Sequence, residues 1–225
     1  MQLVELDRNR VARAPVVVGG YTGRDELAVR HHIDELARIG VAPPMNVPEF
    51  YPVPAGAVTF AAEVDVDTQH TSGEVEPVLL RLGGELYLTL GSDHTDRKAE
   101  ADVGVAESKQ RCPKPLSGQG LRCTAAELDT AWDEVRLSAH VDGRSYQAGH
   151  CAALRPLTET LCLYTERTGG TEDDLVLFGG TVPLLGHEFS YGEHWQMTLE
   201  TTAHQLELTY STRVRTTEGA IHGQG

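Results

Sequence analysis

Short apolar runs separated by turn residues dominate the chain and predict a fold built mostly from β-strands. The run PVVVGG at 15–20 ends in two glycines, which suits a buried strand. Two pairs of runs flank Gly83-Gly84 and Asp142-Gly143, dipeptides typical of two-residue hairpin turns. These pairs are PVLLRL (77–82) with ELYLTL (85–90), and VRLSAHV (135–141) with RSYQAG (144–149). Further strands are predicted at VTFAAEVDV (58–66), DLVLFGG (174–180), WQMTLET (195–201) and HQLELTYSTRVR (204–215).

Two segments show helical signals instead. Between 25 and about 39 the apolar residues recur at i, i+4, i+7 and i+8, and Gly40 is the expected stop. The apolar positions of this segment are Val29, Ile33, Leu36 and Ala37. Thr124, with Glu127 three residues later, has the pattern of a capping box and predicts a helix that runs to about Glu134.

A proline-rich stretch separates the first helix from the later strands. Five prolines fall between 41 and 56, which exclude regular helix and predict a long ordered connection or a lid over a site. The pattern as a whole predicts an α+β, mostly β fold with two or three helices. With 225 residues and 40 % hydrophobic content, the chain can bury one substantial core, so we expect a single domain over 1–225. It would comprise an N-terminal part (1–57), a β-rich part (58–215) and a frayed tail (216–225).

The charge of the chain excludes several classes of partner. Lys and Arg total 19 against 33 Asp and Glu, and the formal net charge of −14 repels nucleic-acid phosphates and anionic membrane surfaces. No apolar run approaches the roughly 20 residues that span a bilayer, and the start MQLVELDRNR lacks the order of a secretion signal. We therefore expect a cytoplasmic protein. The four cysteines are too dispersed for a C-x2-C zinc site and should be free structural or incidental thiols: Cys112, Cys123, Cys151 and Cys162.

Carboxylates gather at the two ends of the first predicted hairpin. In Glu74-Val75-Glu76 the glutamates alternate, so in a strand both side chains point to the same face. Like charges side by side repel, and a cation between them makes the arrangement favourable. Asp93 lies just beyond the second strand, so the hairpin turn can return it beside the glutamates. Three carboxylates on one face suit Mg²⁺, Mn²⁺ or Ca²⁺; the alternative is that they coat a solvated strand face.

Five short motifs follow one another along the chain between about residues 16 and 200. They are Glu74-Val75-Glu76, the segment from Ser92 to Arg97, Ser108-Lys109, the segment from Asp142 to Gln147, and Gly180-Thr181-Val182. Their order resembles that of the fumarylacetoacetate hydrolase superfamily, which carries E-x-E, N-D-x-x-x-R, a lysine, N-G-x-x-x-Q and a late G-T-P. The chain is similar to a bacterial branch of this superfamily through YTGRDELAVRHHIDELARIGV, SGEVEP, SDHTDRK and SKQRCPKP.

The resemblance implies a fold and a metal. Members are mixed β-rolls, like the C-terminal domain of fumarylacetoacetate hydrolase, and commonly form homodimers, so we expect a homodimer. Glu74, Glu76 and Asp93 would bind a divalent metal, Mg²⁺ or alternatively Mn²⁺ or Ca²⁺. The metal would hold the oxygens of a small-molecule carboxylate or dicarbonyl substrate, such as a 2-keto acid, and stabilise its enolate.

Hydrolytic relatives use an early histidine and glutamate to activate water, and the resemblance assigns these roles to His32 and Glu35. The two residues stand three apart on the predicted helix and share a face, so the carboxylate could orient the imidazole. His31 is the competing base. Because His32 borders the apolar stripe, a histidine packed in the core is the alternative interpretation.

The remaining positions implied by the resemblance would support catalysis or bind substrate. Lys109 would neutralise developing negative charge or pair with a substrate carboxylate, with a surface lysine as the alternative. Asp96 and Arg97 would hold the metal-binding acids in place. The expected substrate contacts are Tyr21, Arg24, Gln147, Gly180 and Thr181. For Tyr21 and Arg24, a plain turn after the first strand explains the residues nearly as well.

Three classes of function are consistent with these features. The first is a divalent-metal-dependent hydrolase or lyase that cleaves or decarboxylates a β-dicarbonyl or 2-keto acid. The second keeps the metal-bound enolate but performs isomerisation, hydration, dehydration or cyclisation in a biosynthetic pathway. The third is a non-catalytic binding protein on the same fold. We take the first class as the working hypothesis.

Overall fold

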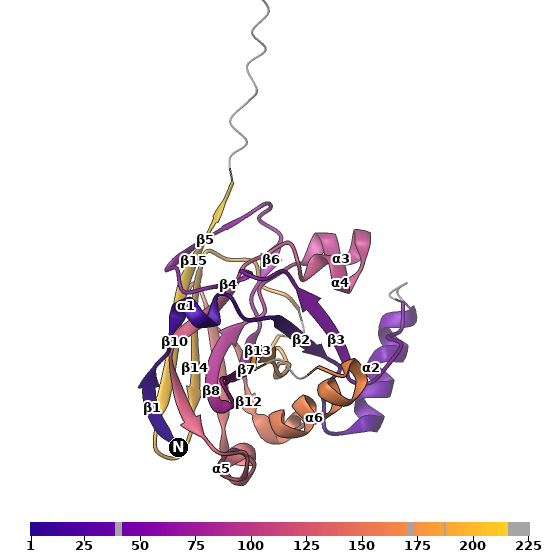
Figure 1. The fold of residues 1–225 in the computed structure, drawn as a ribbon. Helices are drawn as coiled ribbons and strands as arrows, with labels where there is room; N and C mark the ends of the chain where they lie inside the picture. The colour runs from indigo at the N-terminus through magenta and orange to yellow at the C-terminus, as the bar shows by residue number, and fades with distance from the viewer. Residues whose placement is uncertain (39–41, 171–172, 187, 216–225) are drawn as a thin grey trace, which may run out of the picture.

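Two mixed β-sheets packed face to face form most of the protein (Figure 1). The computed structural model describes residues 1–38, 42–170, 173–186 and 188–215. The larger sheet has eight strands, of which β4 (Val58–Thr59) pairs with β10 off the main path. The other seven follow the order β1 (Gln2–Glu5), β10 (Lys114–Cys123), β8 (Glu85–Ser92), β7 (Val75–Leu82), β13 (Asp174–Phe178), β2 (Val16–Gly20) and β3 (Glu49–Val53).

The second sheet has five strands and packs on one face of the first. Its order is β12 (Arg144–His150), β11 (Arg136–Val141), β14 (His194–Glu200), β15 (Gln205–Val214) and β5 (Glu63–Val66). A two-stranded ladder is added by β6 (Thr71–Ser72) and β9 (Thr95–Asp96). The predicted α+β, mostly β fold class is therefore confirmed.

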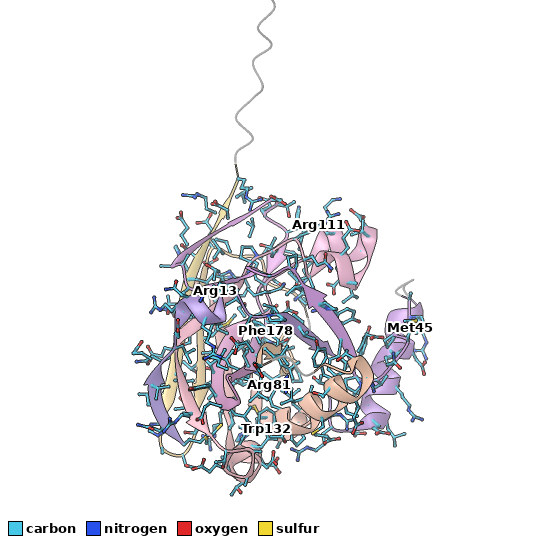
Figure 2. The ribbon with its side chains drawn as sticks, viewed as in Figure 1. Arg13, Met45, Arg81, Arg111, Trp132 and Phe178 are labelled. Carbon is cyan, nitrogen blue, oxygen red and sulfur yellow. The ribbon has the colours of Figure 1, made fainter. Side chains whose placement is uncertain are left out.

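Separate apolar clusters cover the two faces of the larger sheet, because successive residues of a strand point to opposite faces. In β7, Leu79 belongs to the cluster between the two sheets, whereas Val78 belongs to the cluster on the other face. Phe178 lies in this second cluster, fully buried near the centre of Figure 2. Glu74 and Glu76 lie four and two residues before Val78, so their side chains point to the same face as Val78, beyond the end of the second apolar cluster.

Both predicted hairpins are confirmed. Gly83-Gly84 joins β7 to β8, and Asp142-Gly143 joins β11 to β12. The φ angles are 60° and 84° in the first turn and 47° and 75° in the second. Two consecutive positive φ values fit the turns that match the twist of paired strands, and glycine adopts such values without steric cost.

The two predicted helices are present. The first is α2 (Glu26–Arg38), and its expected stop at Gly40 lies outside the described residues. The second is α5 (Ala125–Ala131), which continues into a 3₁₀ turn (Trp132–Glu134). The capping box forms as expected, with the Thr124 hydroxyl accepting from the backbone of Glu127 and the Glu127 carboxylate accepting from the backbone of Thr124.

The expectation of two or three helices was wrong, because the described residues contain six α-helices. The largest addition is α6 (Leu157–Thr168), which ends where Gly169 adopts a left-handed conformation. Its sequence did carry a helical signal, with apolar Leu157, Leu161 and Tyr164 at i, i+4 and i+7. The other additions are short: α1 (Arg8–Val11), α3 (Arg97–Val103) and α4 (Val105–Ser108).

The proline-rich stretch, predicted as a long ordered connection or a lid over a site, instead contributes a strand, because part of it forms β3 at the edge of the larger sheet. Among the described strands β3 pairs only with β2, so one side of its backbone can accommodate Pro52. Phe50 packs edge-on against Tyr164 of α6 at 5.4 Å between ring centres. Tyr51 packs on the opposite face, with the second apolar cluster.

Within the described part of the chain, none of the helices has the length and apolar character needed to cross a membrane. The possible tail at 216–225 lies outside the described residues.

Replacing Gly91 of β8 with alanine should destabilise the fold. An added Cβ would lie 2.6 Å from Cε1 of Phe178 and 2.8 Å from Cγ2 of Val78, too close without movement of the core. We expect the free energy of unfolding to fall by about 1–3 kcal/mol, as overpacked cores usually show. Urea denaturation measures the change, and Gly186→Ala is the control because a Cβ there meets nothing within 4 Å. An unchanged midpoint for Gly91→Ala would contradict this account.

Candidate functional site

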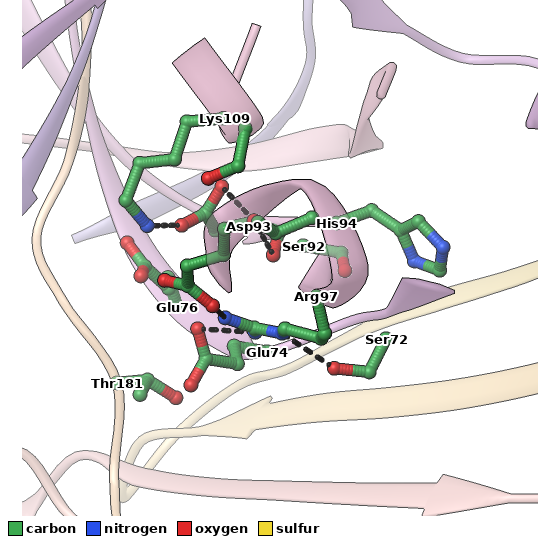
Figure 3. A network of polar contacts seen from close by, with 12 residues as sticks. Ser72, Glu74, Glu76, Ser92, Asp93, His94, Arg97, Lys109 and Thr181 are labelled. Carbon is green, nitrogen blue, oxygen red and sulfur yellow. Dashed lines mark hydrogen bonds and ion pairs between the residues drawn. The ribbon is translucent and has the colours of Figure 1, made fainter. Parts of the chain in front are cut away.

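The three carboxylates predicted as metal ligands lie at one end of the β7–β8 hairpin (Figure 3). Glu74 directly precedes β7, Glu76 lies within it, and Asp93 directly follows β8. The amide of Asp93 donates to the carbonyl of Glu74 at 3.0 Å, which extends the ladder to this end. The hairpin thus returns Asp93 to a position opposite Glu74.

Two buried lysines hold the carboxylate of Asp93. Lys109, which follows α4, contacts Oδ2, and Lys114, the first residue of β10, lies 2.8 Å from Oδ1. Asp93 and Lys114 are completely buried, and Lys109 is 7 % exposed. Burial alone would raise the pKa of Asp93, but the two ammonium groups hold it well below its usual range. Asp93 is therefore an anion whose two oxygens both face cations.

Arg97 pairs with Glu74 from the start of α3. Its Nη2 lies 2.8 Å from Oε2 of Glu74, and its Nη1 donates to Glu100 at 2.9 Å. The remaining guanidinium nitrogen, Nε, donates to the hydroxyl of Ser72 at 2.9 Å. Asp96 caps the same helix by accepting from the amide of Ala99 at 2.9 Å. Arg97 therefore contacts the acidic site from the start of α3, and Asp96 caps that helix.

Glu76 lacks a cation of its own among the described residues. Its Oε2 accepts from the amide of Gly180 at 2.9 Å, and the side chain is buried. Burial raises the pKa of Glu76 well above its usual range, and the charges of Asp93 and Glu74 add to this rise, whereas Lys109 and the amide of Gly180 oppose it. Glu76 is thus the carboxylate whose ionised form the protein stabilises least.

Gln147 of β12 ties the glutamate strand to the turn after β13. Its amide oxygen accepts from the N–H of Val75 at 3.0 Å, and its nitrogen donates to Thr181 and to the carbonyl of Val182 at 2.8 and 2.7 Å. Thr181 in turn donates to the carbonyl of Val75 at 2.8 Å. Because the amide of Gln147 is engaged on both sides within the protein, we interpret it as a positioning residue rather than a substrate contact.

Tight packing fixes the turn that carries Gly180 and Thr181. Gly180 has a φ of 91°, and a Cβ there would overlap the hydroxyl of Thr22. Only glycine fits this position, so its amide points at Glu76 rather than at open solvent.

The expected substrate contacts Tyr21 and Arg24 lie apart. Tyr21 has a φ of 56°, an uncommon value for a residue with a side chain. Burial raises the pKa of Tyr21, and the charge of Glu100 contributes, which puts the phenol within electrostatic reach of the acidic site. Arg24 instead pairs with Asp133 at 2.6 Å, where the structure shows no contact with the three carboxylates.

Sequence reasoning missed three residues at or beside the site. Lys114 lies between two prolines and carries no local signal of burial. Tyr51 has its ring centre 5.9 Å from Nζ of Lys109, but the proline-rich stretch hid its strand. His94 is buried between the hydroxyls of Thr71 and Tyr210, 2.9 Å from each, and burial lowers its pKa to about 3.

The expected catalytic pair lies on α2, whose backbone is described, but the side chains of His32 and Glu35 lie outside the described residues. The competing residue, His31, is exposed on the same helix. The four thiols are free, with Cys162 exposed and the other three buried.

As the side chains stand, no three carboxylate, imidazole or thiol groups of the described residues converge closely enough to hold a metal ion. Asp93 turns to its lysines and Glu74 turns to Arg97. The donor set still fits a hard divalent ion in kind, since three carboxylates start from one face and Glu76 has no ion-pair partner among the described residues. A shared ion would require Glu74 and Asp93 to rotate toward Glu76.

Comparison with known proteins places the chain by sequence and by fold. A family model described as "Protein of unknown function (DUF2848)" matches residues 19–210. No curated protein matches the chain in sequence. A candidate fumarylpyruvate hydrolase from Burkholderia cenocepacia has a similar solved structure, with a TM-score of 0.65, 16 % identity and 96 % coverage of both chains.

Two further solved structures extend this likeness. One is 2-keto-3-deoxy-D-arabinonate dehydratase complexed with magnesium and 2,5-dioxopentanoate, with a TM-score of 0.62, 16 % identity, and coverage of 91 % of this chain and 74 % of that chain. The other is a candidate fumarylacetoacetate isomerase/hydrolase from Oleispira antarctica, with a TM-score of 0.62, 17 % identity, and coverage of 90 % and 93 %. The fold is that of fumarylacetoacetate hydrolase-like proteins, as the order of motifs predicts.

Replacing Gln147 with leucine should destabilise the protein, because it leaves the buried N–H of Val75 without an acceptor. We expect the free energy of unfolding to fall by about 1–3 kcal/mol, the usual cost of an unsatisfied buried polar group. Chemical denaturation measures this loss. Ser145→Ala on the same strand is the control, since Ser145 makes an exposed contact with His140 and should change little. Equal stabilities of the two variants would show that the tie is dispensable.

Proposed function

The chain belongs to the family described as protein of unknown function DUF2848, and we propose that it is a divalent-metal-dependent enzyme acting on a 2-keto acid or β-dicarbonyl substrate. The observation that carries this proposal is the buried carboxylate Glu76, which has no ion-pair partner among the described residues and lies beside Glu74 and Asp93 at one end of a hairpin. The fold supports it, because solved proteins with this fold include a dehydratase complexed with magnesium. The working hypothesis is hydrolysis or carbon–carbon bond cleavage, including decarboxylation.

Glu74, Glu76 and Asp93 would hold the ion, Mg²⁺ in the first instance and Mn²⁺ or Ca²⁺ as alternatives. When bound, such an ion acts as a Lewis acid that stabilises an enolate. Gly180 fixes Glu76 through its amide, and Arg97 restrains Glu74. These contacts come from separate elements of the fold and restrain Glu76 and Glu74, and a shared ion would still require Glu74 and Asp93 to rotate toward Glu76.

Lys109 is the cation placed to receive a substrate carboxylate. Its Nζ reaches Asp93 and lies 5.9 Å from the ring centre of Tyr51. Its contact with Asp93 raises the pKa of Lys109, against the lowering effect of burial, so the group is an ammonium at neutral pH. Tyr51 and Tyr21 would border the substrate on this side, where both phenols feel the charge of Lys109.

His32, oriented by Glu35, would take a proton from water in a hydrolase. Alternatively, the same metal site would support isomerisation, hydration, dehydration or cyclisation without this pair. The dehydratase among the solved neighbours favours this second candidate. Either reaction makes the metal ligands essential, whereas only hydrolysis requires His32.

Glu76→Gln tests the metal site. The glutamine keeps an oxygen for the amide of Gly180 but loses the negative charge, so we expect the affinity for Mg²⁺ or Mn²⁺ to fall by about tenfold or more. Isothermal titration calorimetry measures the affinity. Glu85→Gln is the control, because Glu85 lies at the far end of the same hairpin. Unchanged affinity in Glu76→Gln would remove Glu76 from the ligand set.

The reaction class is tested by measuring acylpyruvate cleavage and oxaloacetate decarboxylation side by side. In a hydrolase, His32→Ala should lower kcat for cleavage by roughly 10²- to 10⁴-fold, the usual contribution of a general base, with metal affinity nearly intact. Arg30→Ala, at an exposed position of the same helix, is the matched control, and His31→Ala tests the competing base. Near-full activity in His32→Ala would exclude the hydrolytic pair and favour the second candidate. Turnover of neither substrate with Mg²⁺ present would contradict the hydrolase and lyase proposal.

A further inference from the structure

Lys114 is a completely buried lysine that the proposed chemistry does not use. Its Nζ lies 2.8 Å from Oδ1 of Asp93 and donates to the carbonyl of His94 at 2.6 Å. Asp93 already has a cation on its other oxygen, because Lys109 contacts Oδ2. Burying a second ammonium beside one carboxylate is costly, so its presence calls for an explanation.

The charges around Asp93 give that explanation. The ionic network contains four carboxylates, Glu74, Glu76, Asp93 and Glu100, and three cations, Arg97, Lys109 and Lys114. With all seven of these groups ionised, the formal charge of the network is −1. A divalent ion would turn this charge to +1, and one negative charge from a bound ligand would return it to zero. Without Lys114, the divalent ion alone would neutralise the network.

We propose that Lys114 acts as a built-in countercation of Asp93, weakening the binding of the metal alone and making tight metal binding depend on an anionic ligand. The inference rests on the proposed function, because it concerns the same metal site. Buried charges interact strongly, since little water screens them. Lys114 repels an incoming divalent ion and also occupies the oxygen of Asp93 that does not face Lys109.

Such an arrangement couples the metal to its substrate. If a ligand raises the affinity of the protein for the metal, the metal must raise the affinity for that ligand by the same factor. The site would then hold its ion firmly only when a carboxylate-bearing chelator is present, and neutral dicarbonyl compounds would gain little. Lys114 is a positioning residue in this account, because it acts through Asp93 rather than on the substrate.

The test is calorimetric titration of Mn²⁺ with and without oxamate, a monoanion that offers two oxygens. In the wild type, oxamate should tighten Mn²⁺ binding by about tenfold or more. Lys114→Met should bind Mn²⁺ alone about tenfold or more tightly than the wild type and gain less from oxamate. Lys114→Gln, which keeps a donor for Asp93, should behave like Lys114→Met. Lys98→Met is the matched control, since Lys98 is exposed and pairs with Asp102.

The outcomes separate this inference from the proposed function. Equal Mn²⁺ affinity in the wild type and both Lys114 variants would overturn the role of Lys114 and leave the metal site standing. Absence of Mn²⁺ binding in the wild type under both conditions would overturn the metal site and this inference together. If circular dichroism shows that both Lys114 variants are unfolded, the wild-type titration decides: an affinity unchanged by oxamate overturns the proposal, and a tenfold gain supports it.

Discussion

The register of the β7–β8 ladder is the constraint on which the other features depend. Pairing from Val75 with Ser92 to Leu82 with Glu85 sets which residues face each apolar cluster. A slip of one residue would exchange the two faces of a strand and would turn Glu76 into the core between the sheets. Two adjacent glycines close the hairpin at one end, and the bond from Asp93 to Glu74 closes it at the other.

Buried charge is the second constraint, and the chain meets it within a short stretch after the hairpin. Arg97, Lys109 and Lys114 follow Asp93 within one α3–α4–β10 segment, and each reaches back to a carboxylate. Removing one partner of a buried ion pair typically costs about 3–5 kcal/mol. The helices α3 and α4 therefore do more than connect strands, since their positions supply the cations that make the acidic cluster tolerable.

Local signals predicted part of this structure well. Both hairpins followed from glycine-containing turns, and α5 followed from its capping box, because these features depend on neighbours in sequence. The alternation of Glu74 and Glu76, with Asp93 after the return strand, also predicted their shared location. Lys114, by contrast, could not be recognised, because its role depends on a contact with Asp93, 21 residues earlier and just beyond β8. Gln147 was expected to bind substrate, yet both ends of its amide bond within the protein.

Gln147 also has a mechanical consequence. It belongs to the smaller sheet, but it forms hydrogen bonds with the start of β7 in the larger sheet and with the turn that contains Gly180. A shift of one sheet relative to the other would therefore displace Glu76, because the side-chain amide of Gln147 bonds to the backbone of Val75 and of Val182. Substitutions on the outer surface of the smaller sheet could in this way retune the acidic cluster without touching any of its members.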